Sequence, residues 1–163
     1  NATISDSTGI LTITDDDNAP TVTLASSASS VAENGSDLTL TATLSNATTA
    51  AVTVGISTSG TGTEGTDYAT VSDITISAGA TTGTAAFNPT DDSVYEGDET
   101  GIIAIDTVSG GSATENSTPQ AVTLTISENE SAPTVSLSST ATTVYDNGSN
   151  PLLSSGLDIL IVV

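Results

Sequence analysis

The sequence predicts an all-β protein that folds as an antiparallel β-sandwich, and three observations lead to this prediction. Thr, Ser, Val and Ile dominate the 163-residue chain, and this composition favours strands over helices. Apolar and polar residues alternate with a period of two in several segments, whereas no segment shows a convincing helical period. Seven such segments, separated by turn sequences, lie within about 112 residues, which is the spacing expected of a seven-stranded sandwich.

The strand segments can be placed in order along the chain. The first opens at Pro20, where a missing backbone N–H is tolerated. In the second, Leu38, Leu40, Ala42 and Leu44 alternate with threonines, so one face is apolar and the other polar. Turn sequences that contain Gly separate the later segments, at 34–35, 59–62, 78–79 and 110–111. The expected strands are 20–26, 37–45, 51–58, 71–77, 81–88, 100–108 and 120–127.

An internal repeat sets the domain organisation. Residues 11–24, LTITDDDNAPTVTL, match residues 124–137, LTISENESAPTVSL, at an offset of 113 residues. The segments VAENGS at 31–36 and VYDNGS at 144–149 keep the same offset. We therefore expect an array of domains with very short linkers. Its parts here are the last strand of a preceding repeat (1–18), a complete domain (19–130), and the first strands of a following repeat or an inter-subunit strand segment (131–163).

The acidic residues are clustered and have no internal counter-charge. The net charge is −20, the chain contains no Lys, Arg or His, and half of its 20 acids lie in 15–17, 91–99 and 128–130. Two carboxylates about 4 Å apart repel by roughly 4 kcal/mol at an effective dielectric near 20, so gathering them requires an external cation. Calcium, which prefers oxygen ligands, is the natural candidate. An acidic surface that only keeps the protein soluble would instead predict scattered acids.

Several classes of function are disfavoured by what the chain lacks. Without Lys or Arg it cannot neutralise phosphates, so nucleic acid and anionic membrane surfaces are not expected partners. No apolar run reaches the roughly 18 residues of a membrane helix, so membrane insertion is not expected. The absence of Cys and His removes thiol and imidazole chemistry, and no EF-hand loop or nucleophile motif is present. We therefore expect no enzymatic activity.

Four pieces of sequence, in a fixed order, resemble a known family. They are Val31-Ala-Glu33-Asn, Gly65-Thr-Asp67-Tyr68, the acidic run 91–99, and Glu128-Asn-Glu130 after the last strand. With these pieces, residues 19–130 resemble a Calx-beta domain. The resemblance implies a seven-stranded immunoglobulin-like sandwich that holds calcium at one end and that occurs in bacterial surface repeat proteins.

The resemblance also implies a set of calcium ligands. The implied ligands are the carboxylates of Glu33, Asp67, Asp91, Asp92, Glu96, Glu99, Glu128 and Glu130 and the backbone carbonyl of Val94. Asp98 is expected to point to solvent. Ser93 and Asn129 replace family acids, which implies fewer or weaker ions, and Gly101 replaces a common aromatic, which implies a looser site.

Strand order supports this arrangement without the resemblance. Alternate connections of antiparallel strands meet at the same end of a sandwich, so the four acidic segments can converge there. The competing interpretation of each single acid is a solvated loop residue or an Asx turn.

These observations predict a calcium-stiffened structural repeat of an extracellular surface adhesin, stalk or filament. The alternative is a calcium-sensing regulatory domain; repetition with almost no linker favours the first, because a sensor usually occurs singly. The expected partners are neighbouring repeats or identical subunits, and the sequence indicates no particular adhesive ligand.

The C-terminal strand suggests how subunits would pair. Aligning Asp158 with Asp37 places Leu160 and Val162 where the second strand has threonines, and a strand that is apolar on both faces is typically covered on both sides. Residues 153–163 are therefore a candidate donor strand for a neighbouring subunit, unless the chain is a window from a longer protein.

Overall fold

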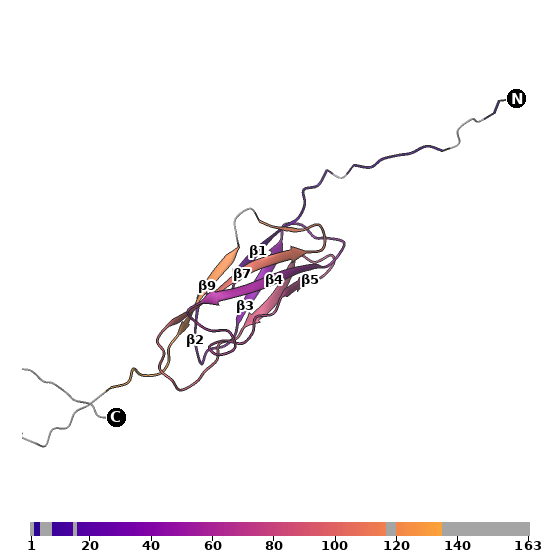
Figure 1. The fold of residues 1–163 in the computed structure, drawn as a ribbon. Helices are drawn as coiled ribbons and strands as arrows, with labels where there is room; N and C mark the ends of the chain where they lie inside the picture. Colours follow the sequence, from indigo (N-terminus) through magenta and orange to yellow (C-terminus); the bar gives the residue numbers. More distant parts are fainter. Residues whose placement is uncertain (1, 4–7, 15, 117–119, 135–163) are drawn as a thin grey trace, which may run out of the picture. The chain divides into compact units, whose positions relative to one another are not determined.

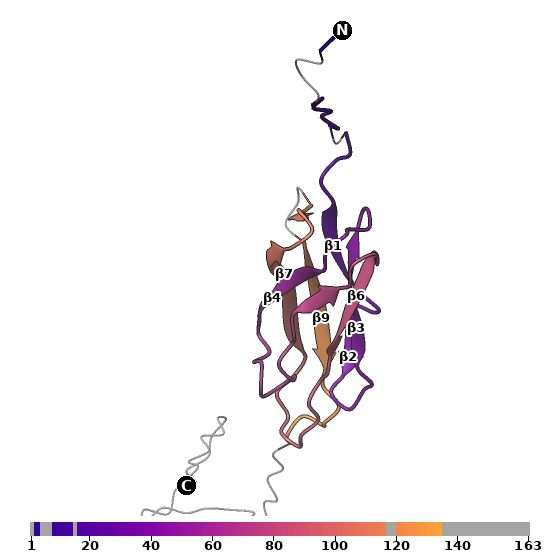
Figure 2. The same cartoon turned by 90° about the vertical axis from the view of Figure 1, so that its right-hand side faces the viewer.

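The strands form two facing sheets, as Figures 1 and 2 show. The structure is a computed structural model that describes residues 2–3, 8–14, 16–116 and 120–134. One sheet has the order β6-β3-β1-β8 and the other β2-β9-β7-β4-β5, and no helix occurs among the described residues. The strands are β1 (Thr21–Ser26), β2 (Ser30–Ala32), β3 (Leu38–Leu44), β4 (Val52–Gly60), β5 (Ile74–Ile76), β6 (Thr82–Phe87), β7 (Glu99–Ser109), β8 (Thr114–Glu115) and β9 (Ala121–Ser127). The predicted all-β sandwich is confirmed.

All seven expected segments contain a strand, and the structure adds two short ones. β2 pairs in parallel with β9, and β8 pairs in parallel with β1, whereas the longer strands pair antiparallel. The chain divides into the units Asn1–Ala132 and Pro133–Val163. The proposed donor strand 153–163 lies outside the described residues. Within those residues, no helix has the length and apolar character needed to span a membrane.

The core is thin and aliphatic and lies between the two sheets. Leu38, Leu40, Ala42 and Leu44 of β3 are buried, while the threonines between them face outward, as the alternation predicts. Tyr68 and Phe87 are the largest fully buried side chains. Their rings stack with centroids 4.8 Å apart, so these two aromatic residues pack together in the core.

The pairing registers place the acidic segments at one end of the sandwich. β1, β4, β6 and β9 finish at the end where β3 and β7 begin, because these pairs are antiparallel in the observed registers. This end carries the connections between β2 and β3, between β4 and β5, and between β6 and β7, together with the residues that follow β9. We call it the acidic end. The turns between β3 and β4 and between β7 and β8 lie at the opposite end, where the chain enters (Figure 2).

Gly101 does not loosen the core, so the expectation drawn from it was wrong. The Phe87 ring from the other sheet lies directly over this glycine. A Cβ on Gly101 would lie 3.0 and 3.1 Å from two Phe87 ring carbons and 3.8 Å from Tyr68. Phe87 of β6 therefore occupies the space over Gly101 of β7.

We expect Gly101→Phe to destabilise the domain because its ring would compete with Phe87 for that space. Overpacking of a filled core typically costs about 1–3 kcal/mol. Chemical denaturation compared with Ala104→Phe, which places the same ring on the outward face of the same strand, measures the effect. Equal stability of the two variants would contradict the packing described here.

Candidate metal centre

The predicted ligands all lie at the acidic end, and six of the carboxylates form two groups of three. Glu33, Glu128 and Glu130 form the first group, and Asp67, Glu96 and Glu99 form the second. Within each group, one oxygen from each carboxylate lies within 4.8 Å of the other two. Both groups therefore have the spacing of oxygen atoms that can share one cation.

The first group depends on the parallel pairing of β2 with β9. Ala32 pairs with Ser127, so the residues that follow them, Glu33 and Glu128, emerge side by side. The Glu33 backbone N–H donates to the Ser127 carbonyl at 3.1 Å, which continues the pairing by one step. Glu33 is 5% exposed, and its side chain lies against those of Glu128 and Glu130.

The second group joins the turn before Tyr68 to the beginning of β7. Asp67 is 8% exposed, and its carboxylate accepts a hydrogen bond from the Thr63 backbone N–H, which closes a short turn. Its own carbonyl accepts from the Thr90 N–H at 2.9 Å, so the turn is tied to the strand end at β6. Glu99 is the first residue of β7, and Glu96 comes from the loop just before it.

The loop 91–98 is bound to the residues after β9 by hydrogen bonds. A single oxygen, Oε2 of Glu128, accepts from the backbone N–H groups of Glu96 at 2.6 Å and Gly97 at 2.8 Å. The Glu128 N–H in turn donates to Asp98 Oδ1 at 3.0 Å. Asp98 is exposed, as expected, but this hydrogen bond also ties its loop to the residue that directly follows β9.

Asp91, Asp92 and Val94 lie in the same loop but outside both groups of three. Asp92 Oδ1 accepts from the Val94 N–H at 2.7 Å, which is an Asx-type turn. Asp91 Oδ1 accepts from the side-chain amide of Asn129 at 3.3 Å. The roles of these three residues as calcium ligands stay predictions.

Asn129 makes hydrogen bonds at the acidic end that the sequence interpretation missed. Its amide also donates to Glu130 Oε1 at 3.1 Å, so it bridges the carboxylates of Asp91 and Glu130. The sequence interpretation treated this asparagine as a lost acid. Its position between two acids was the available signal, since an amide there supplies hydrogen-bond donors to a crowded group of acceptors.

The chain has no Lys, Arg or His to neutralise these carboxylates, and crowding and burial shift the pKa values of several of them. Burial, reinforced by the charges of Glu128, Glu130 and Asp92, raises the pKa of Glu33 to about 7. Burial first and the charge of Asp67 second raise the pKa values of Glu96 and Glu99.

The pKa of Glu128 shifts in the opposite direction. Backbone N–H groups of Glu130, Glu96 and Gly97 donate to it, and they lower its pKa to about 2. The ionised Glu128 is hydrogen-bonded to Glu130 and thereby raises the pKa of that residue.

A cation fits both groups because each contains buried oxygens that nothing in the described chain satisfies. Oε2 of Glu33, Glu99 and Glu130 is buried without a hydrogen-bond partner. Such groups are rare in folded proteins, because an unsatisfied buried polar atom costs free energy. Only oxygen ligands are present, which suits a hard cation such as Ca²⁺.

The protein is a two-sheet β-sandwich. At one end it carries two groups of three carboxylates each, and each group has the oxygen spacing that a divalent cation requires. The Calx-beta family matches residues 15–130, and the chain belongs to this family. Calx-beta domains are non-catalytic domains that bind Ca²⁺.

Solved structures show the same fold. The apo-form Calx CBD1 domain has a TM-score of 0.55 and 20% identity, over 67% of this chain and 98% of that one. CBD12 from CALX1.2 has a TM-score of 0.54 and 21% identity, over 66% of this chain and 44% of that one. The calcium-binding domain CBD12 of CALX1.1 has a TM-score of 0.52 and 22% identity, over 61% of this chain and 41% of that one. This chain thus spans less than half of the two CBD12 chains. The search of curated proteins gave no match.

Proposed function

We propose that this chain is a calcium-stiffened structural repeat of an extracellular surface protein, in an adhesin, stalk or filament. The observation that carries the proposal is the position of the carboxylate groups at the end where the chain leaves the domain. Glu128 and Glu130 belong to the first group, and only Ser131 and Ala132 separate them from Pro133, which is the counterpart of Pro20 in the 113-residue repeat. A cation bound there acts both inside the domain and at the start of the linker.

Each of the two groups would hold one ion. Glu33, Glu128 and Glu130 would bind the first and Asp67, Glu96 and Glu99 the second. Asp91, Asp92 and the carbonyl of Val94 are candidates for further ligands. A bound Ca²⁺ supplies the positive charge that the chain lacks. The protein's part is to hold the oxygens in place, which the hydrogen bonds from Glu96 and Gly97 to Glu128 already do.

Neighbouring repeats or identical subunits are the partners in this proposal. The repeated sequence supports it, because an array produces length, and a linker of only a few residues transmits the orientation of one domain to the next. Residues 153–163 remain the candidate donor strand between subunits. A secreted or cell-surface location belongs to the same proposal.

An array should therefore be stiff with calcium and flexible without it. We expect the longest dimension of a protein with three consecutive repeats to shrink when calcium is chelated, because like charges at each junction then repel and release the linker. Small-angle scattering measures this dimension. The same protein with Glu33→Gln and Glu128→Gln in every repeat should show the shorter dimension even with calcium present.

Equal dimensions in the two states would contradict the structural role. A calcium effect confined to the local shape of each domain would instead support the regulatory alternative.

A further inference from the structure

The turn between β2 and β3 carries the pair Asn34-Gly35 at the acidic end of the domain. The Gly35 N–H donates to the Ala32 carbonyl at 2.8 Å and closes a four-residue turn. Neither Glu33 nor Asn34 has a positive φ, so the turn is of type I. The Asn34 side chain is exposed, and Glu33 belongs to the first carboxylate group. The pair therefore directly follows a candidate calcium ligand.

The packing of this turn requires glycine at position 35. A Cβ there would lie 2.7 Å from Val31 Cγ2 and 2.8 Å from the Ala32 carbonyl oxygen, which is too close for any larger residue. The same missing Cβ leaves the Gly35 nitrogen unhindered as a nucleophile toward the side-chain amide of Asn34. Apart from Asn147, which lies outside the described residues, every other asparagine of the chain precedes a residue with a side chain. The fold thus imposes the Asn-Gly pair that is most prone to react with itself.

The reaction converts the Asn34 amide into an acid and uses only water. The Gly35 nitrogen loses its proton to solvent and bonds to Cγ of Asn34, while the bond from Cγ to Nδ2 breaks and ammonia leaves with a proton from water. Water then adds to either carbonyl carbon of the resulting five-membered imide, breaks the bond from that carbon to the Gly35 nitrogen, and restores the N–H. One water is consumed and one ammonia released, with no change of oxidation state. The product is aspartate or isoaspartate, in which the main chain passes through Cγ.

The closed turn prevents this attack in two ways. Its hydrogen bond keeps the Gly35 N–H on the Ala32 carbonyl. The second central residue of a type I turn, here Asn34, has a ψ of about 0°, which directs the following nitrogen away from the Asn34 Cβ and Cγ. Ring formation needs that nitrogen on the side of Cβ. The reaction therefore proceeds only from the fraction of molecules in which the turn is locally open.

Opening the turn must move Glu33, which is its first central residue. The Glu33 N–H donates to the Ser127 carbonyl at 3.1 Å, and its carboxylate lies with those of Glu128 and Glu130, which follow the same strand, β9. A cation shared by this group would link the turn to the end of β9 a second time. An ion that binds only the closed form lowers the open fraction in proportion to its free concentration divided by its dissociation constant.

We propose that Asn34 is a self-modification site, attacked by Gly35, and that calcium in the first group keeps it unreacted, an inference that rests on the calcium binding proposed above. Release of ammonia makes the reaction irreversible. Isoaspartate lengthens the main chain inside a turn whose glycine is already tightly packed, so the turn no longer places Glu33 beside Glu128. A domain kept without calcium thus progressively loses its ability to bind the ion.

Mass spectrometry of the 163-residue chain tests this proposal. The protein is incubated at mildly alkaline pH with calcium or with chelator and then digested with a protease that cleaves beside aliphatic residues, because the chain has no Lys or Arg. Conversion appears as the small mass gain that accompanies replacement of NH₂ by OH, and isoaspartate as a separate chromatographic peak.

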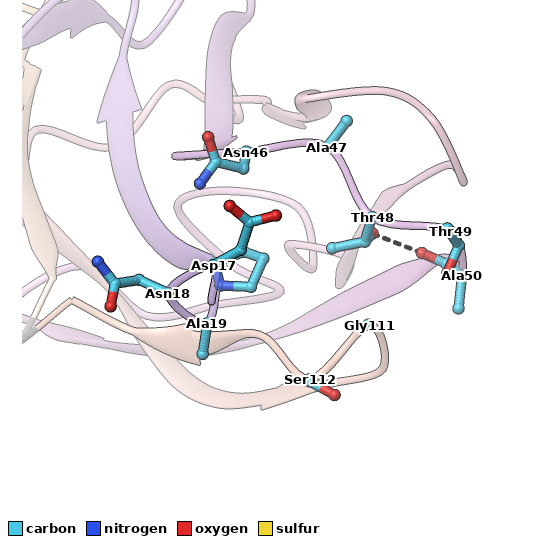
Figure 3. A pocket seen from close by; sticks show the side chains of 11 residues that line it. Asp17, Asn18, Ala19, Asn46, Ala47, Thr48, Thr49, Ala50, Gly111 and Ser112 are labelled. Atoms are coloured by element: carbon cyan, nitrogen blue, oxygen red, sulfur yellow. Dashed lines mark hydrogen bonds between the residues drawn. The ribbon is translucent and has the colours of Figure 1, made fainter. Parts of the chain in front are cut away.

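Asn46 provides the internal reference in the same sample. It is exposed, it precedes Ala47, and it lies at the opposite end of the domain from the two carboxylate groups. There it lines a cavity of about 810 Å³, across which its side chain points toward Asp17 (Figure 3). Its rate therefore reports the reactivity of an exposed asparagine whose following residue carries a Cβ.

We expect Asn34 to convert at least about tenfold more slowly with calcium at about a hundred times its dissociation constant than in chelator, because the ion suppresses opening of the turn by up to about a hundredfold. In chelator Asn34 should convert faster than Asn46, and fastest of all in urea, where no turn remains. Glu33→Gln should abolish the protection by calcium, since it removes a charged ligand from the first group. Asp106→Asn, which changes an exposed acid of β7 outside both groups, should retain the protection.

Equal rates at Asn34 with and without calcium would overturn the protection by calcium. A rate at Asn34 no higher than at Asn46 in chelator would overturn the modification site itself. Calorimetric titration of the freshly prepared chain with calcium decides the proposed function separately. Calcium binding combined with equal rates would therefore reject this inference alone, whereas absence of calcium binding would reject the proposed function and the protection together.

The converted protein supplies the last readout. After incubation in chelator, calorimetry should show weaker calcium binding in proportion to the fraction of isoaspartate at position 34. Unchanged calcium affinity in fully converted protein would contradict the loss of binding with age.

Discussion

Chelation of calcium is expected to lower the melting temperature of the wild-type protein by roughly 10 °C for each filled group. A ligand at a hundred times its dissociation constant stabilises the folded state by about 2.7 kcal/mol. One kcal/mol corresponds to about 4 °C in a domain of this size. Without the ion, the buried oxygens of Glu33 and Glu99 have no partner, and the surrounding carboxylates repel one another.

Substitutions of acids at the two groups should reduce this calcium-dependent stabilisation. Glu96→Gln removes a charged ligand from the second group, and Asp92→Asn removes a charge that acts on both Glu33 and Glu96. Each should abolish much of the calcium-dependent gain. Asp106→Asn is the matched control, because it removes an exposed acid of β7 that belongs to neither group. Differential scanning calorimetry with and without chelator measures the effect, and an unchanged wild-type melting temperature would reject the calcium site.

Most strands that could be predicted are long enough to show a period, and the three-residue strand β5 was predicted because it lies within a longer alternating segment, 71–77. Seven residues of alternating Leu or Ala and Thr identify β3, whereas β2 has three residues and β8 has two, too few to display any alternation. Their parallel pairing is set by tertiary contacts. This matters for the site, because the pairing of β2 with β9 is what brings Glu33 beside Glu128.

The sequence indicated which end of the sandwich is acidic but not how the acids are divided. Alternation of strand direction was enough to predict that the four segments converge. The division into two groups of three depends on loop hydrogen bonds, such as those from Glu96 and Gly97 to Glu128, which have no sequence period. The Gly101 error had a similar origin, since the ring that fills its space comes from Phe87 on the opposite sheet.

Glu33→Gln is expected to change stability in opposite directions with and without calcium. In the calcium-free protein the pKa of Glu33 is about 7, against an ordinary value of 4.5. Between these values the folded state keeps a proton that the unfolded chain has lost. The resulting stability is fully present below pH 4.5 and is lost as the pH rises through about 7. At pH 8 the wild-type protein therefore holds an unfavourable buried charge, which a neutral Gln removes.

Calcium reverses this preference, because the ion requires the ionised carboxylate. Binding must displace the Glu33 proton, so affinity should fall by up to about tenfold per pH unit below pH 7. Glu128 does not add to the pH dependence between pH 4.5 and 7. Its pKa is lowered to about 2, so its contribution to stability is lost only as the pH falls from 4.5 toward 2. Urea denaturation at pH 8 should thus show Glu33→Gln more stable than wild type in chelator and less stable in calcium. A variant that is less stable in both conditions would mean that Glu33 stabilises the fold without the ion, which is incompatible with an unsatisfied carboxylate held for a cation.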